Sequence, residues 1–517
     1  MARLAHLWSR FTMGIMSSLA AYVFFLATLL FALPLTSHAS ESQPGDRSSR
    51  VRDAVQPILQ EMALKYNMSF SFGFADVGGR VGLAAGKDNI WKDTQLKAHT
   101  PIPLGSVTKP WTAVLIMQAV ERGELSLDDT ASTWVDPVLG RLWNESLLKL
   151  WKDPRVEEVR IKDLMGMTSG FYDYDDFFME HITLNHTADD IGPLEYIASS
   201  AKQGFACNPG SCALYAGSNF VLLGLVLVQV NELFAWQDVN QLGAISPILW
   251  KKGHYHNTSF LKLGRCVQTP GVARQYAWAY WNEEKDANEP QEFIDLGYSS
   301  CLNGWTMGNI VSTGKDLATF FYDLFTVSPE EGGFLKQTSL QLMQKYKTLN
   351  DTWCEGPTGY GSCTYGMGLL GNQVGQDIWE LTDANADPDE IRISGHPGED
   401  WGSGCSPCGY NHKYKFGICM AYTSVMGQNC SGDFRSNNDA VQEATCLAYD
   451  AVLSIVGAPR LNCAVRMPSQ DPIHIRNCTW EKRYKNHTQS MRPKSARYPA
   501  SLRRGFVRSR YQDLTHI

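Results

Sequence analysis

Residues 104–110 read LGSVTKP and place Ser106 three residues before Lys109, at the start of an apolar stretch. Residues 106–122 carry apolar side chains at helical spacing and stop at Gly123, a residue common at helix ends. Side chains three residues apart on a helix share a face, so the lysine amine is expected beside the serine hydroxyl. A lysine desolvated at a helix start can lose its proton and activate serine as a nucleophile. Taken alone, the pattern also fits a serine that caps the helix beside a solvated lysine.

Three further stretches indicate the fold class. Residues 219–229 are apolar almost throughout, which predicts a helix buried on nearly all sides. Runs at 69–76 and 416–425 read as strands near the two ends of the chain. Strands at both ends with helices between them predict an α+β domain whose ends share one antiparallel sheet. The motifs described below must converge in space, so we expect one large two-lobed domain.

Composition and charge limit the classes of function. The chain has 517 residues, of which 44% are hydrophobic and 11% aromatic, enough for a well-packed core. The formal net charge of −7 is unevenly spread, with +2 in residues 1–40, +8 in residues 479–517 and therefore −17 in between. An acidic body repels phosphate backbones, so the sequence argues against nucleic acid as a partner.

The N-terminus has the pattern of a secretory signal. Two arginines precede an apolar run over residues 13–35, and small residues at 37–39 offer a cleavage site. The run is about as long as the roughly 20 residues that span a bilayer, so an uncleaved membrane anchor is the alternative. We expect residues 1–40 to be a signal peptide or signal anchor, residues 41–50 a flexible linker, and the body to be secreted or lumenal.

Cysteines and sequons indicate the same compartment. All thirteen cysteines lie between Cys207 and Cys478, and eight Asn-x-Ser/Thr sequons accompany them. Together they fit a disulfide-bonded glycoprotein, and the odd cysteine is free or pairs with another chain. The sequons begin at Asn67, Asn144, Asn185, Asn257, Asn350, Asn429, Asn477 and Asn486.

Seven motifs follow one another along the chain: LGSVTK (104–109), GELSLDD (123–129), IKDLMGMTSG (161–170), YAGSNFVLLG (215–224), MGNIVSTGKDLA (307–318), YGMG (365–368) and GHPG (395–398). In this order they resemble the signatures of the serine β-lactamase and penicillin-binding-protein superfamily, most closely the branch of class C β-lactamases, esterases and D-aminopeptidases. The resemblance covers roughly residues 55–455. It implies a β-lactamase/transpeptidase-like α+β fold for a catalytic domain at 51–460, with an antiparallel sheet flanked by helices and a helical lobe at about 130–303.

The resemblance implies a role for each matching residue. Ser106 is the acylated nucleophile, Lys109 activates it, and Tyr215 relays protons between nucleophile, leaving group and water. A phenol is a poor base unless a cation stabilises its anion, and Lys109 would be that cation. No cofactor and no metal is implied, because these three side chains handle nucleophilic attack and proton transfer.

The GHPG motif supplies the strand that lines the implied site. There, His396 would offer a hydrogen-bond donor or a partial charge. The N–H of Glu399 would form an oxyanion hole with that of Ser106. Gly398 would keep the strand free of a side chain so that substrate can approach its backbone. The alternative for His396 is a solvated loop histidine.

Three departures from the family pattern bear on the substrate. Gly217 stands where the family often has asparagine, and Pro397 replaces a threonine whose hydroxyl holds a substrate carboxylate. Glu399 and Asp400 add negative charge beside that carboxylate's place. All three disfavour anionic β-lactams and D-Ala-D-Ala peptides. The sequence therefore predicts a serine hydrolase acting through a Ser106 acyl-enzyme on a neutral or cationic small-molecule or peptide-like ester or amide.

Alternative interpretations remain for the function and for two other patterns. An inactive binding protein or an acyl or peptidyl transferase would carry much the same residues. Cys405 and Cys408 with His396 and His412 could be drawn as a zinc site, although disulfides suit a secreted chain better. The basic tail at 461–517 is expected to be largely disordered by composition, and could instead bind anionic glycans or lipid headgroups.

Overall fold

The computed structural model describes most of the predicted catalytic body. Of the sequons, those at Asn67, Asn185, Asn429, Asn477 and Asn486 lie outside the described residues, as does the apolar run at 13–35. Among the helices that are described, none is long and apolar enough to cross a membrane. The described residues are 44–66, 68–89, 92–174, 190–278, 293–298, 301, 304–350, 363–371, 391–400, 402–423, 435–461 and 463.

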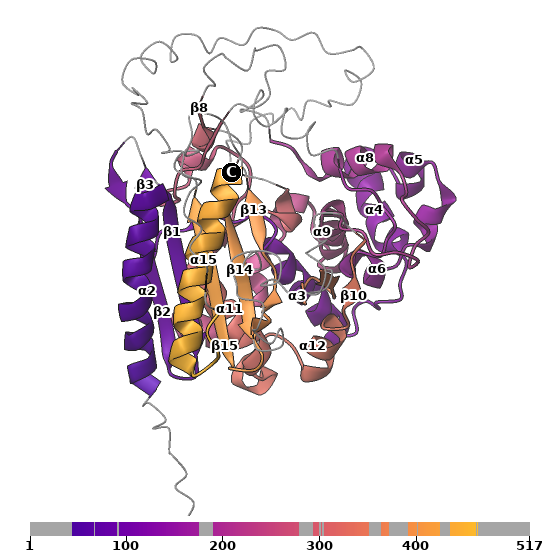
Figure 1. The fold of residues 1–517 in the computed structure, drawn as a ribbon. Coiled ribbons are helices and arrows are strands. Elements are labelled where there is room, and N and C mark those ends of the chain that lie inside the picture. Colours follow the sequence, from indigo (N-terminus) through magenta and orange to yellow (C-terminus); the bar gives the residue numbers. More distant parts are fainter. Residues whose placement is uncertain are drawn as a thin grey trace, which may run out of the picture.

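The main sheet is antiparallel and joins the two ends of the body, as the sequence predicts (Figure 1). β1 pairs with β15 over nearly its whole length, from Ser69 opposite Thr423 to Ala75 opposite Gly417. Both strands lie where the sequence predicts them. The strand order is β12 (Ser394–Gly395), β14 (Ser403–Asn411), β15 (Phe416–Thr423), β1 (Ser69–Asp76) and β2 (Gly79–Ala85), with β13 (Gly398–Asp400) also paired to β14.

Helices cover both faces of this sheet. α2 (Pro44–Tyr66) and α15 (Arg435–Val456) lie side by side along one face (Figure 1), where Lys65 forms an ion pair with Glu443 at 2.7 Å. α11 (Gly314–Thr326) packs against β1 and β15. Alternating side chains of the central strands therefore enter two separate apolar cores, one on each side of the sheet.

The predicted linker at 41–50 is helical from Pro44 onward, where the flexible-linker interpretation is wrong. α2 begins at Pro44, and Arg47 in its first turns contacts Asp76 at the end of β1, with 3.0 Å between Nη1 and Oδ2. Polar composition alone does not reveal such a contact, because its partner lies 29 residues away.

A helical lobe stands beside the sheet, as the family resemblance implies (Figure 1). α9 is buried from Ser218 to Val228, which confirms the predicted buried helix. α3 begins two residues later than predicted, at Thr108, so that Ser106 lies in the turn before it. The helices are α3 (Thr108–Glu121), α4 (Ala131–Trp143), α5 (Leu147–Trp151), α6 (Ile161–Met165), α8 (Pro193–Gln203), α9 (Ser218–Val230), α10 (Pro247–Lys251) and α12 (Gln337–Met343).

Shorter strand pairs lie outside the main sheet. A three-stranded sheet of β5 (Ile102–Pro103), β9 (Ile310–Ser312) and β6 (Ser259–Phe260) lies under the turn that carries Ser106. The remaining pairs are β3 (Lys87–Asn89) with β4 (Thr94–Gln95), β7 (Tyr276–Trp278) with β8 (Phe293–Asp295), and β10 (Lys347–Thr348) with β11 (Thr364–Tyr365).

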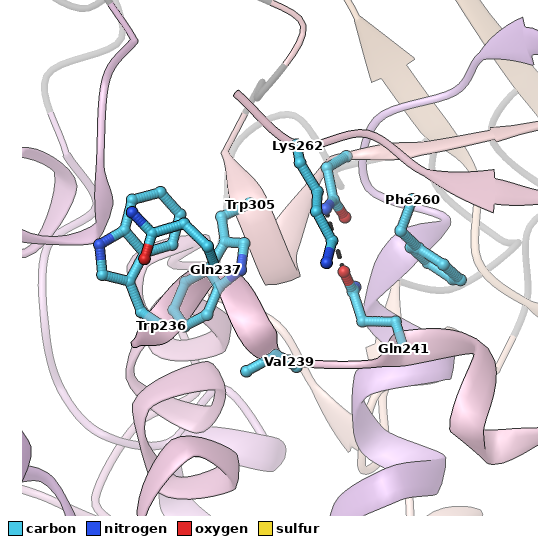
Figure 2. A pocket seen from close by; sticks show the side chains of 8 residues that line it. Trp236, Gln237, Val239, Gln241, Phe260, Lys262 and Trp305 are labelled. Carbon is cyan, nitrogen blue, oxygen red and sulfur yellow. Dashed lines mark hydrogen bonds between the residues drawn. The ribbon is translucent and has the colours of Figure 1, made fainter. Parts of the chain in front are cut away.

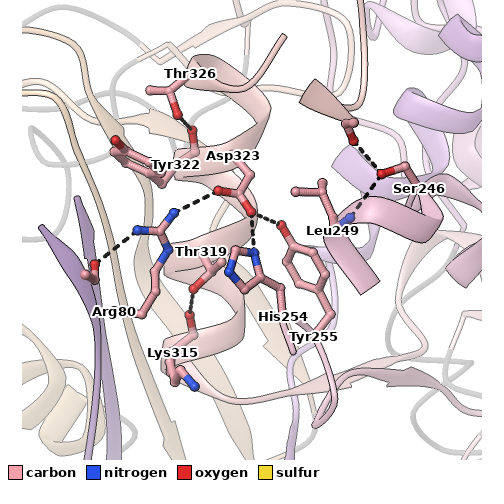
Figure 3. Close-up of polar contacts among 12 residues, drawn as sticks. Arg80, Ser246, Leu249, His254, Tyr255, Lys315, Thr319, Tyr322, Asp323 and Thr326 are labelled. Atoms are coloured by element: carbon pink, nitrogen blue, oxygen red, sulfur yellow. Dashed lines mark hydrogen bonds and ion pairs between the residues drawn. The ribbon is translucent and has the colours of Figure 1, made fainter. Parts of the chain in front are cut away.

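A buried carboxylate ties α11 to two other segments (Figure 3). Asp323 accepts hydrogen bonds from Tyr255 at 2.6 Å and His254 at 2.8 Å, and pairs with Arg80 of β2 at 2.9 Å. Burial would raise the pKa of Asp323, but the hydrogen bonds from His254 and Tyr255 and the Arg80 charge lower it below its usual value. The carboxylate therefore stays ionised and anchors the helix to the sheet edge.

Four disulfides support the prediction of a disulfide-bonded chain. The sulfurs of Cys405, Cys408 and Cys419 lie within 4.8 Å of one another, but Cys408 and Cys419 are bonded together across β14 and β15. His396 and His412, drawn with Cys405 and Cys408 as a zinc site, make hydrogen bonds to Pro397 and Gln344. The disulfides in which both cysteines are described are Cys207–Cys212, Cys266–Cys301, Cys408–Cys419 and Cys446–Cys463.

Candidate active site

Ser106 lies in a tight turn whose backbone is fixed on both sides. Gly105 has a φ of +57°, a left-handed conformation that suits glycine, and forms a parallel bridge with Asn309. Thr108 Oγ1 donates to the Gly105 carbonyl at 2.7 Å and accepts from the Ile310 N–H at 3.0 Å. The turn is thus held against β9 before any substrate arrives.

The predicted catalytic residues Lys109 and Tyr215 meet at the Ser106 hydroxyl. The Lys109 amine donates to Ser106 Oγ at 2.8 Å, and the Tyr215 hydroxyl donates to the same atom at 3.0 Å. Tyr215 comes from the segment before α9, so residues 109 positions apart in the chain converge here. Two donors on one hydroxyl oxygen favour the deprotonated, nucleophilic form of that serine.

Lys109 is buried, with 2% of its surface exposed, and its polar contacts define its position. Its amine also donates to the Met307 carbonyl at 3.1 Å. It lies 5.0 Å from the ring centroid of Tyr215 and 5.9 Å from that of Phe220, within the range of cation–π contact. A positive charge here would stabilise negative charge on either the serine or the phenol oxygen. Met307 is a site residue that the sequence analysis did not identify. It begins the MGNIVSTGKDLA motif, but no sequence pattern predicts that its carbonyl binds Lys109.

β13 touches the nucleophile turn, which brings the two predicted oxyanion donors onto neighbouring backbones. A Cβ built on Gly398 would lie 1.9 Å from the Leu104 carbonyl oxygen, and one on Gly105 would lie 1.9 Å from the Glu399 carbonyl oxygen. Both glycines are therefore required for the close approach of the two backbones. The sequence predicts that Gly398 makes room for substrate; the structure shows that it makes room for the turn that carries Ser106.

His396 is brought to the site but is fully engaged within the protein. Its Nδ1 lies 2.6 Å from the Pro397 carbonyl and its Nε2 lies 3.1 Å from the Tyr365 hydroxyl. Burial, and then the charge of Lys109, lowers the pKa of His396 to about 3. The ring is therefore neutral at physiological pH, with Nδ1 donating to Pro397 and Nε2 accepting from Tyr365. A neutral ring whose two nitrogens are both hydrogen-bonded within the protein does not fit the expected partial charge or free donor. The alternative of a solvated loop histidine does not fit either, because the ring is buried.

Tyr365 is a second residue that sequence reasoning missed, although it opens the YGMG motif. Burial, and then the proximity of Tyr215, raises its pKa well above the usual value for tyrosine. Its ring meets that of Tyr215 edge to face, with 5.9 Å between centroids. The neutral pair of Tyr365 and His396 thus forms one wall behind the Tyr215 ring, and the His396 ring centroid lies 6.1 Å from that of Tyr215.

The absence of a side chain at Gly217 has a steric cause. A Cβ there would lie 2.8 Å from the Met307 sulfur and 3.3 Å from the Tyr174 ring. The asparagine that the family often carries at this place would therefore require the Met307 side chain to shift. The Gly217 N–H is bound instead by Asp173, a third residue that the sequence interpretation did not identify.

The acidic residues predicted to influence substrate choice lie on β13. Glu399 is exposed and Asp400 half-buried, immediately after Gly398. Their carboxylates add negative potential at the end of the strand that carries the predicted oxyanion donor. Pro397 carries no hydroxyl that could hold a substrate carboxylate.

A small hollow below the nucleophile turn is lined by none of the predicted catalytic residues (Figure 2). Its cavity volume is about 10 Å³, and it lies between the rings of Trp236, Trp305 and Phe260, with Lys262 reaching in from the rim. Asn309 donates to Gln241 at 3.0 Å in its floor. The remaining amide atoms of this pair, Gln241 Nε2 and Asn309 Oδ1, are buried without a hydrogen-bond partner within the described part of the chain.

Comparison with known proteins agrees with this geometry. Residues 70–235, which include Ser106, Lys109 and Tyr215, match the Beta-lactamase family. The D-amino acid amidase from Ochrobactrum anthropi SV3, solved with L-phenylalanine amide, superposes with a TM-score of 0.56 at 18% identity, covering 79% of this chain and 98% of the amidase.

Two further solved structures share the fold at similar levels of identity. A D-stereospecific amidohydrolase from Streptomyces sp. gives a TM-score of 0.52 at 18% identity, covering 73% of this chain and 94% of that protein. The octameric penicillin-binding protein homologue from Pyrococcus abyssi gives 0.52 at 19% identity, with 77% and 76% of the two chains covered. At such identities the likeness establishes the fold and leaves the substrate open.

Proposed function

Because this chain has the β-lactamase/transpeptidase-like fold of the serine β-lactamase and penicillin-binding-protein superfamily, we propose that it is a serine hydrolase that forms an acyl-enzyme on Ser106. The observation that carries the proposal is the convergence of Lys109 and Tyr215 on the Ser106 hydroxyl, at 2.8 and 3.0 Å. Amidases and an amidohydrolase among the structural neighbours support a hydrolase in general. Esters and amides are the substrates that such a nucleophile attacks.

In the proposed acylation step, either Lys109 or Tyr215 acts in its deprotonated form, as a neutral amine or a phenolate. That nitrogen or oxygen takes the Ser106 proton while Oγ bonds to the substrate carbonyl carbon. The N–H groups of Ser106 and Glu399 receive the oxyanion. The tetrahedral intermediate then breaks its bond to the leaving alkoxide or amine, which takes the proton that Lys109 or Tyr215 received from Ser106. Water then attacks the carbonyl carbon of the acyl-enzyme and gives up a proton to the same base. The bond to Ser106 Oγ breaks, the acid is released, and Oγ takes the proton back.

We further propose a neutral or cationic substrate. Pro397 lacks the hydroxyl that would bind a substrate carboxylate, and the Glu399 and Asp400 carboxylates repel one. His396, neutral and bound to Tyr365, supplies no compensating cation. Short-chain esters and amides with an uncharged or amino-bearing acyl group satisfy these conditions.

A fluorophosphonate probe tests the hydrolase. It should add its mass to Ser106 in the folded wild type and not to the Ser106→Ala variant. Folded wild type that takes up no probe would support an inactive binding protein. Products formed with an added amine competing against water would separate a hydrolase from a transferase. Efficient hydrolysis of a chromogenic cephalosporin, with none of short-chain aryl esters, would refute the substrate preference.

We propose a secreted or lumenal glycoprotein, with anchoring through residues 13–35 as the alternative to signal cleavage. The four disulfides support an oxidising compartment. Among the described sequons, Asn144 and Asn350 are exposed and Asn257 is half-buried. Enzymatic removal of N-glycans from protein made in a eukaryotic secretory pathway should lower its mass, and an unchanged mass would contradict the assignment.

A further inference from the structure

We infer that Asp173 is the positioning residue for Tyr215. The inference rests on the proposed function, because it concerns the residue proposed to transfer the serine proton. Asp173 does not contact Ser106 in any hydrogen bond described above. It acts on the backbone that carries Tyr215, which lies three residues before α9 begins at Ser218.

The Asp173 carboxylate caps the start of α9. Its Oδ2 accepts from the Gly217 N–H at 2.7 Å, and its Oδ1 accepts from the Ser218 N–H at 3.2 Å. These are among the N–H groups that a helix leaves without an internal partner at its start. A carboxylate also complements the partial positive charge at that end of a helix. Asp173 therefore binds the two residues that directly follow the Tyr215-Ala216 pair.

The loop that presents Asp173 is itself anchored to α8. The Tyr172 N–H donates to the Gly204 carbonyl at 3.1 Å, and Ser200 Oγ donates to the Tyr172 carbonyl at 2.7 Å. Tyr174 packs edge to face on Tyr196, with 5.0 Å between ring centroids. The carboxylate is thus held from both sides by residues of another helix, as a positioning group requires.

The other side of the Tyr215 segment is held independently. The Leu214 N–H donates to the Met167 carbonyl at 2.9 Å, and Asn350 bonds Ala213 through both its backbone and its side chain. Tyr215 therefore lies between two fixed points, one before it and one at Asp173. Without Asp173, the second point is lost at Gly217, the residue type with the greatest backbone freedom.

The need for Asp173 follows from the steric limit at Gly217. The Met307 sulfur lies 2.8 Å from where a Cβ at that position would be, and the Met307 carbonyl holds the Lys109 amine. A side chain at position 217 would therefore displace Met307, the residue that holds Lys109. A carboxylate from the neighbouring loop supports the turn instead, and leaves the contact between Met307 and Lys109 undisturbed.

Kinetics of Asp173→Ala and Asp173→Asn test the inference. Asp173→Ala should lower kcat on a short-chain aryl ester and the fluorophosphonate labelling rate by about 10²-fold, with KM within about twofold, because a misplaced proton-transfer group slows chemistry and leaves binding intact. Asp173→Asn, which keeps one acceptor oxygen, should restore most of the rate. Asp153→Ala is the matched control, because Asp153 caps η1 (Pro154–Glu158) by accepting from the Arg155 N–H at 3.0 Å, and should leave kcat unchanged.

A folded Asp173→Ala protein with wild-type kcat would overturn the inference and leave the proposed function standing. Equal losses in Asp173→Ala and Asp173→Asn, or a loss of the same size in Asp153→Ala, would also overturn it. If Asp173→Ala does not fold, Asp173→Glu tests the inference in its place. This variant keeps the charge but displaces the carboxylate by one methylene, so it should lower kcat and leave KM unchanged. Wild type that takes up no probe would refute both the function and the inference.

Discussion

Replacing Gly398 with alanine should push apart the two backbones that carry the predicted oxyanion donors. The new Cβ would lie 1.9 Å from the Leu104 carbonyl oxygen and 2.8 Å from the Val107 nitrogen. Ordinary contacts begin at 3.4 Å, so one backbone must move by about 1.5 Å, the difference between 1.9 and 3.4 Å. Gly398 is not among the glycines with positive φ, so the collision alone causes the effect. Loss of one oxyanion donor typically lowers kcat about 10²–10³-fold.

The assay is the steady-state hydrolysis of a short-chain aryl ester, with kcat and KM determined separately and thermal unfolding followed in parallel. We expect Gly398→Ala to remain folded, with its melting temperature lowered, and to lose most of its kcat. Gly140→Ala in α4 is the matched control, because the nearest atom to its new Cβ lies 3.9 Å away. A folded Gly398→Ala protein with kcat within about threefold of wild type would refute the assigned contact between β13 and the nucleophile turn.

Two further predictions concern pH and stability. The pKa of His396 is lower in the folded than in the unfolded protein, so its contribution to stability is complete above about pH 6.5 and falls as the pH drops toward 3. Unfolding free energy measured against pH should therefore fall less steeply below pH 6.5 in His396→Gln than in wild type, and parallel curves would contradict a neutral buried imidazole. Asp323→Asn leaves Arg80 without its buried partner and should lower the unfolding free energy at pH 7 by about 3–5 kcal/mol. Because the pKa of Asp323 is lowered on folding, that difference should shrink as the pH falls below 3.8; a pH-independent difference in denaturant unfolding would argue that the carboxylate is not ionised.

Local patterns predicted the elements that depend on a single stretch of sequence. β1 and α9 lie where their apolar patterns place them, because burial of these segments is visible in their own side chains. The Ser106-x-x-Lys109 spacing likewise predicted that the amine meets the hydroxyl. Motif order then predicted the fold class, since each motif marks one element of the same architecture.

The contacts that the sequence did not predict join residues far apart in the chain. Lys109 and the Met307 carbonyl are separated by 198 positions, and Asp173 and Gly217 by 44. Neither contact is visible as a periodic pattern of residue types in the sequence. Each uses a backbone carbonyl or N–H group, which every residue type can offer apart from the N–H that proline lacks. The neutral state of His396 could not be predicted from the sequence for the same reason. The GHPG motif predicts where the residue lies, but its pKa is set by burial among segments that are distant in the chain.

The pairing of β1 with β15 delays the completion of the central sheet during synthesis. Ser69 and Thr423 are opposite each other, yet the ribosome must add about 350 residues between them. At roughly 5–20 residues per second, β1 waits for about 20–70 s with only β2 as a partner. Its apolar residues Phe70, Phe72 and Phe74 then border an unpaired strand edge of the kind that aggregates readily. We therefore expect chaperones to bind this strand in nascent chains, and C-terminal truncations before residue 416 to expose it permanently.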